Sequence, residues 1–401
     1  MTFQTFTGQE YLKIDVANNF GLDKNKWDNR IHWFDANESQ LHSLVPDAEE
    51  PALFYAGILA WEKSQLGQSC GYPISLDATC SGIQILTALS GDRKAAELCN
   101  VVDTGDREDA YVSLYNTMAN KLGTRAKIDR KKTKQAIMTA FYGSTATPRQ
   151  IFGEGEVLKI FYETIQEHAP GPWEINETML NMWDPTALIN EWTLPDNFHV
   201  KVKVMGQMSQ TVTYLGENYE VFHNENMPIK GGRSLGANMV HSIDGMVVRE
   251  MNRRCNYDPV KIKKLLNVAE VGGGGHRSRY QNDGLVQQLW VNYQQSGFLS
   301  ARILDYLSVD NMGLVNPAII TALIKSLPEK PFQVISVHDC FRCLPNYGND
   351  MRRQYNQLLA EIGQSNMLSS ILGQIAGHPI YAGKLDPTLP ADILATNYAL
   401  S

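Results

Sequence analysis

The 401-residue sequence predicts an α+β fold, because helical and strand patterns occupy different stretches of the chain. Apolar residues recur at helical spacing through much of 93–195, whereas apolar and polar residues alternate along parts of 199–222. Two further strand regions are indicated by alternating Ile74 and Leu76, and by the apolar runs around a His-Asp pair within 332–345.

The composition describes a globular protein with a modest acidic excess. Hydrophobic residues make up 43% of the chain and charged residues 20%, and the net charge is −7. This charge excludes a strongly basic nucleic-acid coat, although a basic groove inside an acidic protein is still allowed. The N-terminus does not resemble a signal peptide, and no run of about 18 apolar residues occurs, so we expect a cytoplasmic protein without a membrane span.

Six cysteines are too few for a disulfide framework in a chain of this length and indicate a reducing interior. Cys340 and Cys343 form a lone C-x-x-C pair, without a second pair or a supporting His-x-His. Ordinary strand cysteines are therefore favoured over zinc or redox chemistry at this pair.

The N-terminal stretch leads to a carboxylate at a strand end. Residues 1–70 mix short helical and loop signals, and on pattern alone Lys13 reads as a surface lysine. The strand containing Ile74 and Leu76 ends at Asp77, and small residues lead from there into a helix. A carboxylate in this position is a common metal ligand, and a turn or capping aspartate is the alternative.

One predicted helix carries four side chains at every fourth position, which places them on one slowly drifting face: Arg130, Lys134, Met138 and Tyr142. The two cations suit phosphates, and the aromatic end, beside Gly143 and Ser144, suits a base and a sugar. The alternative is a solvated basic helix, which would not need the apolar and aromatic members of the set.

Strict alternation from residue 199 predicts a β-hairpin or short meander with Lys201 and Lys203 on one face. This element either contacts nucleic acid or is an ordinary sheet. Residues 256–330 are expected to form an accessory module with a flexible loop at Gly272–Gly275. The four glycines do not predict a phosphate loop, because no G-K-S/T follows them.

A His338-Asp339 tip on an otherwise apolar hairpin is hard to explain structurally and indicates function. Two aspartates on separate strands, together with an Arg/Lys helix, are the parts needed for two-metal nucleotidyl transfer. The carboxylates would bridge two Mg²⁺ ions about 4 Å apart, and the helix would neutralise charge on the leaving pyrophosphate. From the sequence pattern alone, His241 is a lone histidine, and a lone histidine is usually structural.

Three motifs then carry a resemblance to a known family. Leu76-Asp77-Ala78-Thr79-Cys80-Ser81-Gly82-Ile83-Gln84 resembles motif A of the single-subunit RNA polymerases of T-seven-type phages and mitochondria. The helix from Arg130 to Ser144 is similar to motif B, R-x-x-x-K-x-x-x-M-x-x-x-Y-G-S, and Val337-His338-Asp339-Cys340-Phe341 is similar to motif C. The order of the three motifs also agrees.

The resemblance implies roles for individual residues. It implies a catalytic group in which Asp77 and Asp339 hold two Mg²⁺ ions. The whole group consists of Asp77, Asp339, Lys134, Tyr142 and His338. It implies a substrate-binding group around the triphosphate, the sugar and the base: Arg130, Lys13, His241, Tyr111, Met138, Gly143, Ser144 and Gly82. Tyr142 and His241 would select ribonucleotides, and Gly82 would leave room for a 2′-hydroxyl. Lys201 and Lys203 would contact DNA, because their hairpin falls where the family has its promoter-reading loop.

The architecture implied is the palm and fingers of a right-hand polymerase of the polymerase A-like superfamily. The expected division is palm with motif A (1–92), fingers (93–197), hairpin (198–232), fingers–palm junction (233–255), accessory insertion (256–330), and palm with motif C and a C-terminal foot (331–401).

Two departures from the family stand out. Gln135 replaces the second cation that usually follows the motif B lysine. The family's N-terminal domain, thumb and Asp-x-x-Gly-Arg element have no counterpart, so the chain resembles the catalytic subunit of the split RNA polymerases of Enquatrovirus-type podophages.

The resemblance implies as partners a DNA template, nascent RNA, ribonucleoside triphosphates and a second subunit carrying the missing elements. It also implies a single-stranded-DNA-binding recruiting factor as a partner. The expected location is the cytoplasm of an infected host cell. The alternatives are a DNA polymerase of the same superfamily and an inactive DNA-binding structural subunit.

Overall fold

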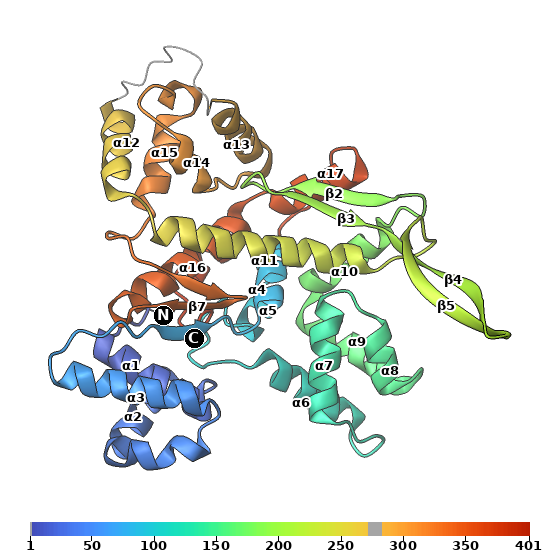
Figure 1. Ribbon diagram of the computed structural model, residues 1–401, viewed down its shortest axis with the longest axis horizontal. Helices are drawn as coiled ribbons and strands as arrows, with labels where there is room; N and C mark the ends of the chain where they lie inside the picture. Colours follow the sequence, from blue (N-terminus) through green and yellow to red (C-terminus); the bar gives the residue numbers. More distant parts are fainter. Residues whose placement is uncertain (1, 272–282) are drawn as a thin grey trace.

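A long helix, α11 (Ser234–Cys255), crosses the centre of the computed structural model, which describes residues 2–271 and 283–401 (Figure 1). The N-terminal helices lie below one end of α11 in this view, and a second group of helices lies below its other end. A third group lies above it. Helices and strands occupy largely separate stretches of the chain, so the predicted α+β class is confirmed.

The N-terminal helices form part of the main hydrophobic core. A capping box starts the first helix, because the Thr7 side chain accepts from Glu10 N and the Glu10 carboxylate accepts from Thr7 N. Trp27, Phe34 and Phe54 are fully buried. The helices are α1 (Gly8–Ala17), α2 (Trp27–Asn37) and α3 (Pro51–Gln65), with a π-helical turn at Asn18–Leu22 and a 3₁₀ segment at Glu38–Asp47.

The central sheet joins the two predicted motif strands. β1 (Ile74–Asp77) and β6 (Ile335–Val337) flank β7 (Cys340–Cys343), and both pairings are antiparallel. All residues of α4 (Ser81–Ser90), which follows β1, are buried. Helices α4, α11 and α16 (Gly348–Gln364) pack against one another, which fixes the end of β1 against α11.

The region predicted to be helical is helical over most of its length, but it ends in a strand. Its helices are α5 (Arg93–Leu98), α6 (Ala110–Leu122), α7 (Arg130–Phe141), α8 (Ala146–Phe152), α9 (Glu156–His168) and α10 (Pro170–Asn181). The expectation of more helix through residue 195 is wrong at its end, since β2 (Ile189–Thr193) pairs with the next strand. Trp192 is buried there, because alternate side chains of β2 point into the core.

The region predicted as a β-hairpin or short meander consists of two separate ladders. β2 pairs with β3 (His199–Lys203), and β4 (Met205–Tyr214) pairs with β5 (Glu217–Asn226). Figure 1 shows β4 and β5 projecting from the body of the molecule. Lys201 and Lys203 lie on β3 rather than on this projection, and Lys201 Nζ lies 3.6 Å from a carboxylate oxygen of Glu191 on β2. The projecting strands themselves contain no lysine or arginine.

The 256–330 stretch forms a helical module with its own core. Its described helices are α12 (Pro259–Val271), α13 (Asp283–Ser296), α14 (Arg302–Tyr306) and α15 (Pro317–Lys325), with a 3₁₀ turn at Met312–Leu314. Their buried apolar side chains form a hydrophobic cluster separate from the main core. The predicted glycine loop, Gly272–Gly275, lies outside the described residues.

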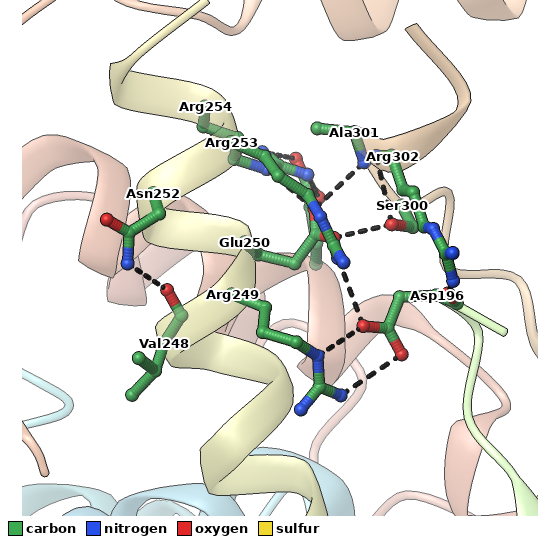
Figure 2. A network of polar contacts seen from close by, with 11 residues as sticks. Asp196, Val248, Arg249, Glu250, Asn252, Arg253, Arg254, Ser300, Ala301 and Arg302 are labelled. Atoms are coloured by element: carbon green, nitrogen blue, oxygen red, sulfur yellow. Dashed lines mark hydrogen bonds and ion pairs between the residues drawn. The ribbon is translucent and has the colours of Figure 1, made fainter. Parts of the chain in front are cut away.

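A buried ionic network fastens this module to α11 (Figure 2). The Glu250 carboxylate accepts from Ala301 N at 2.8 Å and from the Ser300 hydroxyl. On the same helix, Arg253 Nη1 lies 2.8 Å from Glu250 and 3.0 Å from Asp196. Since Glu250 and Asp196 are fully buried, removing one partner would leave an uncompensated charge, which is strongly destabilising. The network therefore fixes α11 relative to the module and the β2–β3 loop.

The C-terminal region returns to the sheet. After a 3₁₀ turn at Pro345–Tyr347, it contains α16, α17 (Met367–Ala376) and α18 (Leu389–Ile393), and Leu400 forms a β-bridge with Ala78. The cysteines, including Cys340 and Cys343 on β7, are all free, which agrees with the strand interpretation. In the described part of the chain no helix is long and apolar enough to cross a membrane.

Candidate active site

The two predicted metal-ligand aspartates lie at neighbouring strand ends. Asp77 is the last residue of β1 and is paired in register with Cys340, the first residue of β7. Asp339 directly precedes Cys340, and its carbonyl accepts a hydrogen bond of 3.1 Å from Ala78 N. Antiparallel pairing of motif A with motif C thus brings residues 262 positions apart (339 − 77) to one edge of the sheet.

His338 forms the bend that carries Asp339. The residue has a φ of 55°, in the left-handed region that is uncommon for a side chain with a β-carbon. Val337 and Cys340 pair on either side of it, so the bend is a two-residue hairpin turn. Backbone outliers of this type cluster at functional sites.

The carboxylates at this edge repel one another. Burial raises the pKa of Asp77 to about 6, and the negative charges of Asp339 and Asp23 add to the shift, while Arg107 opposes it. Burial likewise raises the pKa of Asp244 to about 6, again with a contribution from Asp339. Asp244, on α11, is a third carboxylate at the site that was not selected from the sequence, although it lies three residues after His241.

A cavity of about 280 Å³ opens beside Asp77. It lies between four elements: the last residue of β1, the start of α6, the π-helical turn after α1, and α7. Its charged and aromatic lining includes Asp23, Lys24, Asp77, Arg107, Tyr111 and Lys134. Asp339 does not line the cavity itself, but its carbonyl accepts a hydrogen bond from Ala78 N, and Ala78 lines the cavity.

Lys134 and Tyr111 approach each other across this cavity from two helices. Lys134 Nζ lies 5.1 Å from the centroid of the Tyr111 ring, within cation–π range. Asp109 fixes the start of α6, because its carboxylate accepts from Tyr111 N at 3.0 Å and from Val112 N at 3.1 Å. Burial raises the pKa of the Tyr111 phenol, so this group stays neutral and can donate a hydrogen bond.

Tyr142 lies between motif A and α11. Its ring centroid is 4.8 Å from that of His241. A β-carbon at Gly82 would lie 2.6 Å from Tyr142 Oη, so the phenol packs directly on the glycine backbone. Burial raises the pKa of Tyr142 to about 12, and the charge of Asp244 contributes to the shift. The structure therefore brings Tyr142, His241 and Gly82 together.

Gln84 holds the turn after Asp77 and was not selected from the sequence. Its Nε2 donates to Thr79 Oγ1 at 2.9 Å and to the carbonyls of Cys99 and Ala399, each at 3.0 Å. Its Oε1 accepts from the Tyr355 hydroxyl at 2.7 Å. Because this buried amide has a partner on every side, it links β1, the segment before α6 and the C-terminal residues around the site.

Lys13 lies apart from the cavity. Its Nζ is 2.5 Å from Asp35 and 5.1 Å from the centroid of the Trp61 ring, so the side chain is engaged within the N-terminal helices. Lys24, eleven residues later, lines the cavity instead. The sequence signal for Lys24 is Gly21-Leu22-Asp23-Lys24, in which Gly21 has a φ of 113° and turns the chain toward the site.

The other predicted substrate-binding residues follow the course of α7. Arg130 is exposed at the first residue of α7, and Met138 is 43% exposed on it. Gly143, with a φ of 78°, and Ser144 line a separate cavity of about 350 Å³ bordered by α8 and α10. None of these four residues lines the cavity beside Asp77.

The donor set at the strand ends suits a magnesium ion. Within residues 2–271 and 283–401 no cluster of three or more His, Cys, Asp or Glu side chains is arranged to hold a metal by itself. Magnesium usually takes one or two carboxylates and completes its shell with water and substrate phosphates. Asp77 and Asp339 fit that pattern, and their mutual repulsion is what a bound cation would relieve.

Residues 5–153 match the family model of DNA-dependent RNA polymerase. This region contains Asp77, Tyr111, Lys134 and Tyr142, which the fold brings to one site.

Individual relatives agree with the family match. The chain is 28% identical over 173 residues to a DNA-directed RNA polymerase of Pseudomonas phage phiKMV, covering 34% of this chain and 21% of the relative. It is 25% identical over 189 residues to the T7 RNA polymerase of Escherichia phage T7, with coverage of 34% and 21%. A probable DNA-directed RNA polymerase of Neurospora crassa is 29% identical over 164 residues, with coverage of 34% and 18%. The matched region thus spans about a fifth of the length of these relatives.

Proposed function

We propose that this chain is the catalytic part of a DNA-directed RNA polymerase that joins ribonucleotides on a DNA template. The observation that carries the proposal is the convergence of Asp77 and Asp339 beside a cavity lined by Lys134 and Tyr111. The similarity of residues 5–153 to DNA-dependent RNA polymerases supports the same reaction.

In this proposal Asp77 and Asp339 would hold two Mg²⁺ ions, which supply activation of the 3′-hydroxyl and charge neutralisation on the triphosphate. His338 shapes the turn that presents Asp339. Lys134 binds the phosphates through its ammonium and is placed to neutralise or protonate the leaving pyrophosphate. Tyr142 and His241 contact the sugar edge, where a ribose hydroxyl provides both a donor and an acceptor. Arg130 and Met138 on α7 would contact the incoming nucleotide farther from the metals.

The same proposal assigns the central sheet with α4, α11 and α16 to a palm, and α5–α10 to fingers. The β4–β5 projection takes the place of the promoter-reading loop. Since its strands lack cations, any DNA contact by Lys201 and Lys203 would come from the neighbouring β3.

We further propose that a second polypeptide supplies the N-terminal domain, the thumb and the Asp-x-x-Gly-Arg element of this polymerase. The resemblance of the sequence motifs to split phage polymerases motivates this partner. The site of action would be the cytoplasm of an infected host cell, where a single-stranded-DNA-binding protein would recruit the enzyme.

The test is incorporation of labelled nucleotides on single- and double-stranded DNA, with and without proteins that co-purify from infected cells. We expect template-dependent RNA synthesis that requires Mg²⁺ and increases when the partner is present. Preferential incorporation of deoxynucleotides would instead favour the DNA polymerase alternative. Absence of synthesis by the reconstituted complex would refute the catalytic assignment, and processive synthesis by this chain alone would refute the need for a partner.

A further inference from the structure

Arg107 lines the cavity with a guanidinium group that is only loosely hydrogen-bonded to the protein. It is half-buried in the segment that leads into α6, and it lines the same cavity as Asp77 and Lys134. Its Nε lies 3.3 Å from Ser401 Oγ, and its Nη1 lies 3.5 Å from the Glu108 carbonyl. Both distances are long for hydrogen bonds, so the five N–H donors of this guanidinium are poorly used.

Three other arginines, Arg30, Arg249 and Arg253, are better satisfied than Arg107. Arg30 donates to one amide and two carbonyl oxygens at 2.5–2.9 Å. Arg249 and Arg253 form ion pairs with the buried carboxylate of Asp196. In the described ranges, by contrast, Arg107 forms no ion pair with a carboxylate. The charges of Asp23, Asp109 and Asp77 act on this partly desolvated guanidinium, but none of these carboxylates forms an ion pair with it, so its N–H groups can take an anionic ligand.

The charges around Arg107 narrow the choice of anion. The cavity combines three cations, Lys24, Arg107 and Lys134, with four acidic residues, Asp23, Asp77, Glu108 and Asp109. A bare anion would be repelled by the carboxylates, and a bare cation by the three basic groups. A polyphosphate complexed with a divalent cation satisfies both sets, because its oxygens meet the basic groups and its metal meets the aspartates.

We infer that Arg107 is a further substrate-positioning residue, which binds the phosphate chain of a nucleoside triphosphate in this cavity. This inference rests on the proposed function and adds a contact that none of the three motifs contains. Guanidinium offers two parallel N–H groups to one phosphate, so it orients the phosphate chain as well as attracting it.

The alternative is a purely structural role, in which Arg107 steadies Ser401 and offsets the charge of Asp77. Binding measurements on the full chain separate the two roles without needing catalysis. The probe is inorganic tripolyphosphate with Mg²⁺, titrated by calorimetry into the wild type, Arg107→Ala, Arg107→Lys and Lys134→Ala. Lys26→Ala is the control, because Lys26 pairs with Asp106 on the nearby surface without lining the cavity.

We expect Arg107→Ala to weaken tripolyphosphate binding about tenfold, equivalent to about 1.4 kcal/mol, and Arg107→Lys to recover part of it. Lys26→Ala should bind as the wild type does. In the reconstituted enzyme, Arg107→Ala should raise KM for nucleoside triphosphates more than it lowers kcat, which a merely structural role would not produce. Thermal melting of each variant checks folding, and Arg107→Gln replaces Arg107→Ala should the alanine variant unfold.

Two results would overturn the inference about Arg107. The first leaves the proposed function intact, and the second rejects part of it. Wild-type affinity in Arg107→Ala or Arg107→Gln, with weakened binding in Lys134→Ala, removes the Arg107 contact and leaves the proposed function intact. Failure of the wild type to bind tripolyphosphate with Mg²⁺ rejects the phosphate site as a whole, and with it this part of the proposed function.

Discussion

The phenol oxygen of Tyr142 occupies the space above the backbone of Gly82, 2.6 Å from where a β-carbon on that residue would lie. The absence of a side chain at position 82 therefore makes room for the tyrosine in this structure. The proposed gap for a ribose hydroxyl depends on Tyr142 as much as on Gly82, so we expect the two residues to act together in sugar selection.

Gly82→Ala should displace Tyr142, since an added methyl group at this distance cannot be accommodated without movement. We expect a loss of about 1–3 kcal/mol in the free energy of unfolding, together with weaker discrimination between ribo- and deoxynucleotides. Chemical denaturation and competitive incorporation measure the two effects. Gly71→Ala is the matched control, because a β-carbon there meets no atom within 4 Å. Unchanged stability and selectivity in Gly82→Ala would contradict the contact.

Tyr142→Phe tests the phenol oxygen alone. We expect discrimination against deoxynucleotides to fall roughly tenfold, which is the range of one lost hydrogen bond to a substrate hydroxyl. The ring should stay in place, because the contact of its plane with His241 and the close approach of its Cζ to Gly82 remain. Single-nucleotide incorporation with each sugar type gives the ratio, and Tyr115→Phe on α6 serves as the control. An unaltered ratio argues against a role for this oxygen in sugar selection.

Much of the site could be predicted from the sequence, because three short motifs each place one functional group on a regular element. Asp77 ends a strand, Lys134 and Tyr142 share a helix face, and Asp339 lies in a turn between strands. Local patterns of period two and period four are sufficient for such elements. Pairing β1 with β7 then needs no further information beyond the polymerase resemblance.

What could not be predicted depends on contacts between distant segments. Lys13 lies within α1 and Lys24 follows the turn at Gly21 after it, and of the two only Lys24 lines the cavity. Arg107 and Asp244 have ordinary sequence contexts, and their importance comes from what surrounds them. The division of residues 189–226 into two ladders was missed, because β2 lies in a stretch that had been expected to be helical.

Asp339→Asn should abolish most catalysis while leaving the fold intact. The substitution keeps the shape of the side chain and removes one of two negative charges that would hold Mg²⁺, so we expect a rate loss of roughly a thousandfold or more. Circular dichroism and melting temperature should change little, because the described contact of Asp339 with Ala78 is made by its backbone carbonyl. Near-normal RNA synthesis by this variant would exclude the two-metal role of Asp339.

A buried carboxylate beneath β1 should make the stability of the protein depend on pH. The Asp15 side chain accepts hydrogen bonds from Tyr72 Oη at 2.6 Å, Ser75 N at 2.7 Å and Asn19 Nδ2 at 3.1 Å. Burial nevertheless raises the pKa of Asp15 to about 6 from an ordinary value of 3.8, and these hydrogen bonds and the charge of Arg342 only reduce the shift. The folded state therefore holds a proton that the unfolded chain releases at lower pH.

It follows that the contribution of Asp15 to stability is greatest below pH 4 and is lost as the pH rises through about 6. The loss should amount to roughly 3 kcal/mol at most, since one unit of pKa corresponds to about 1.4 kcal/mol. Asp15→Asn, which cannot titrate, should lower stability at acid pH and show a flatter pH dependence than the wild type between pH 4 and 7. Denaturant unfolding at a series of pH values measures both curves. Their difference isolates Asp15 from Asp77 and Asp244, whose raised pKa values give slopes of the same sign in both proteins. Parallel curves would show that Asp15 ionises in the folded protein as readily as in the unfolded chain.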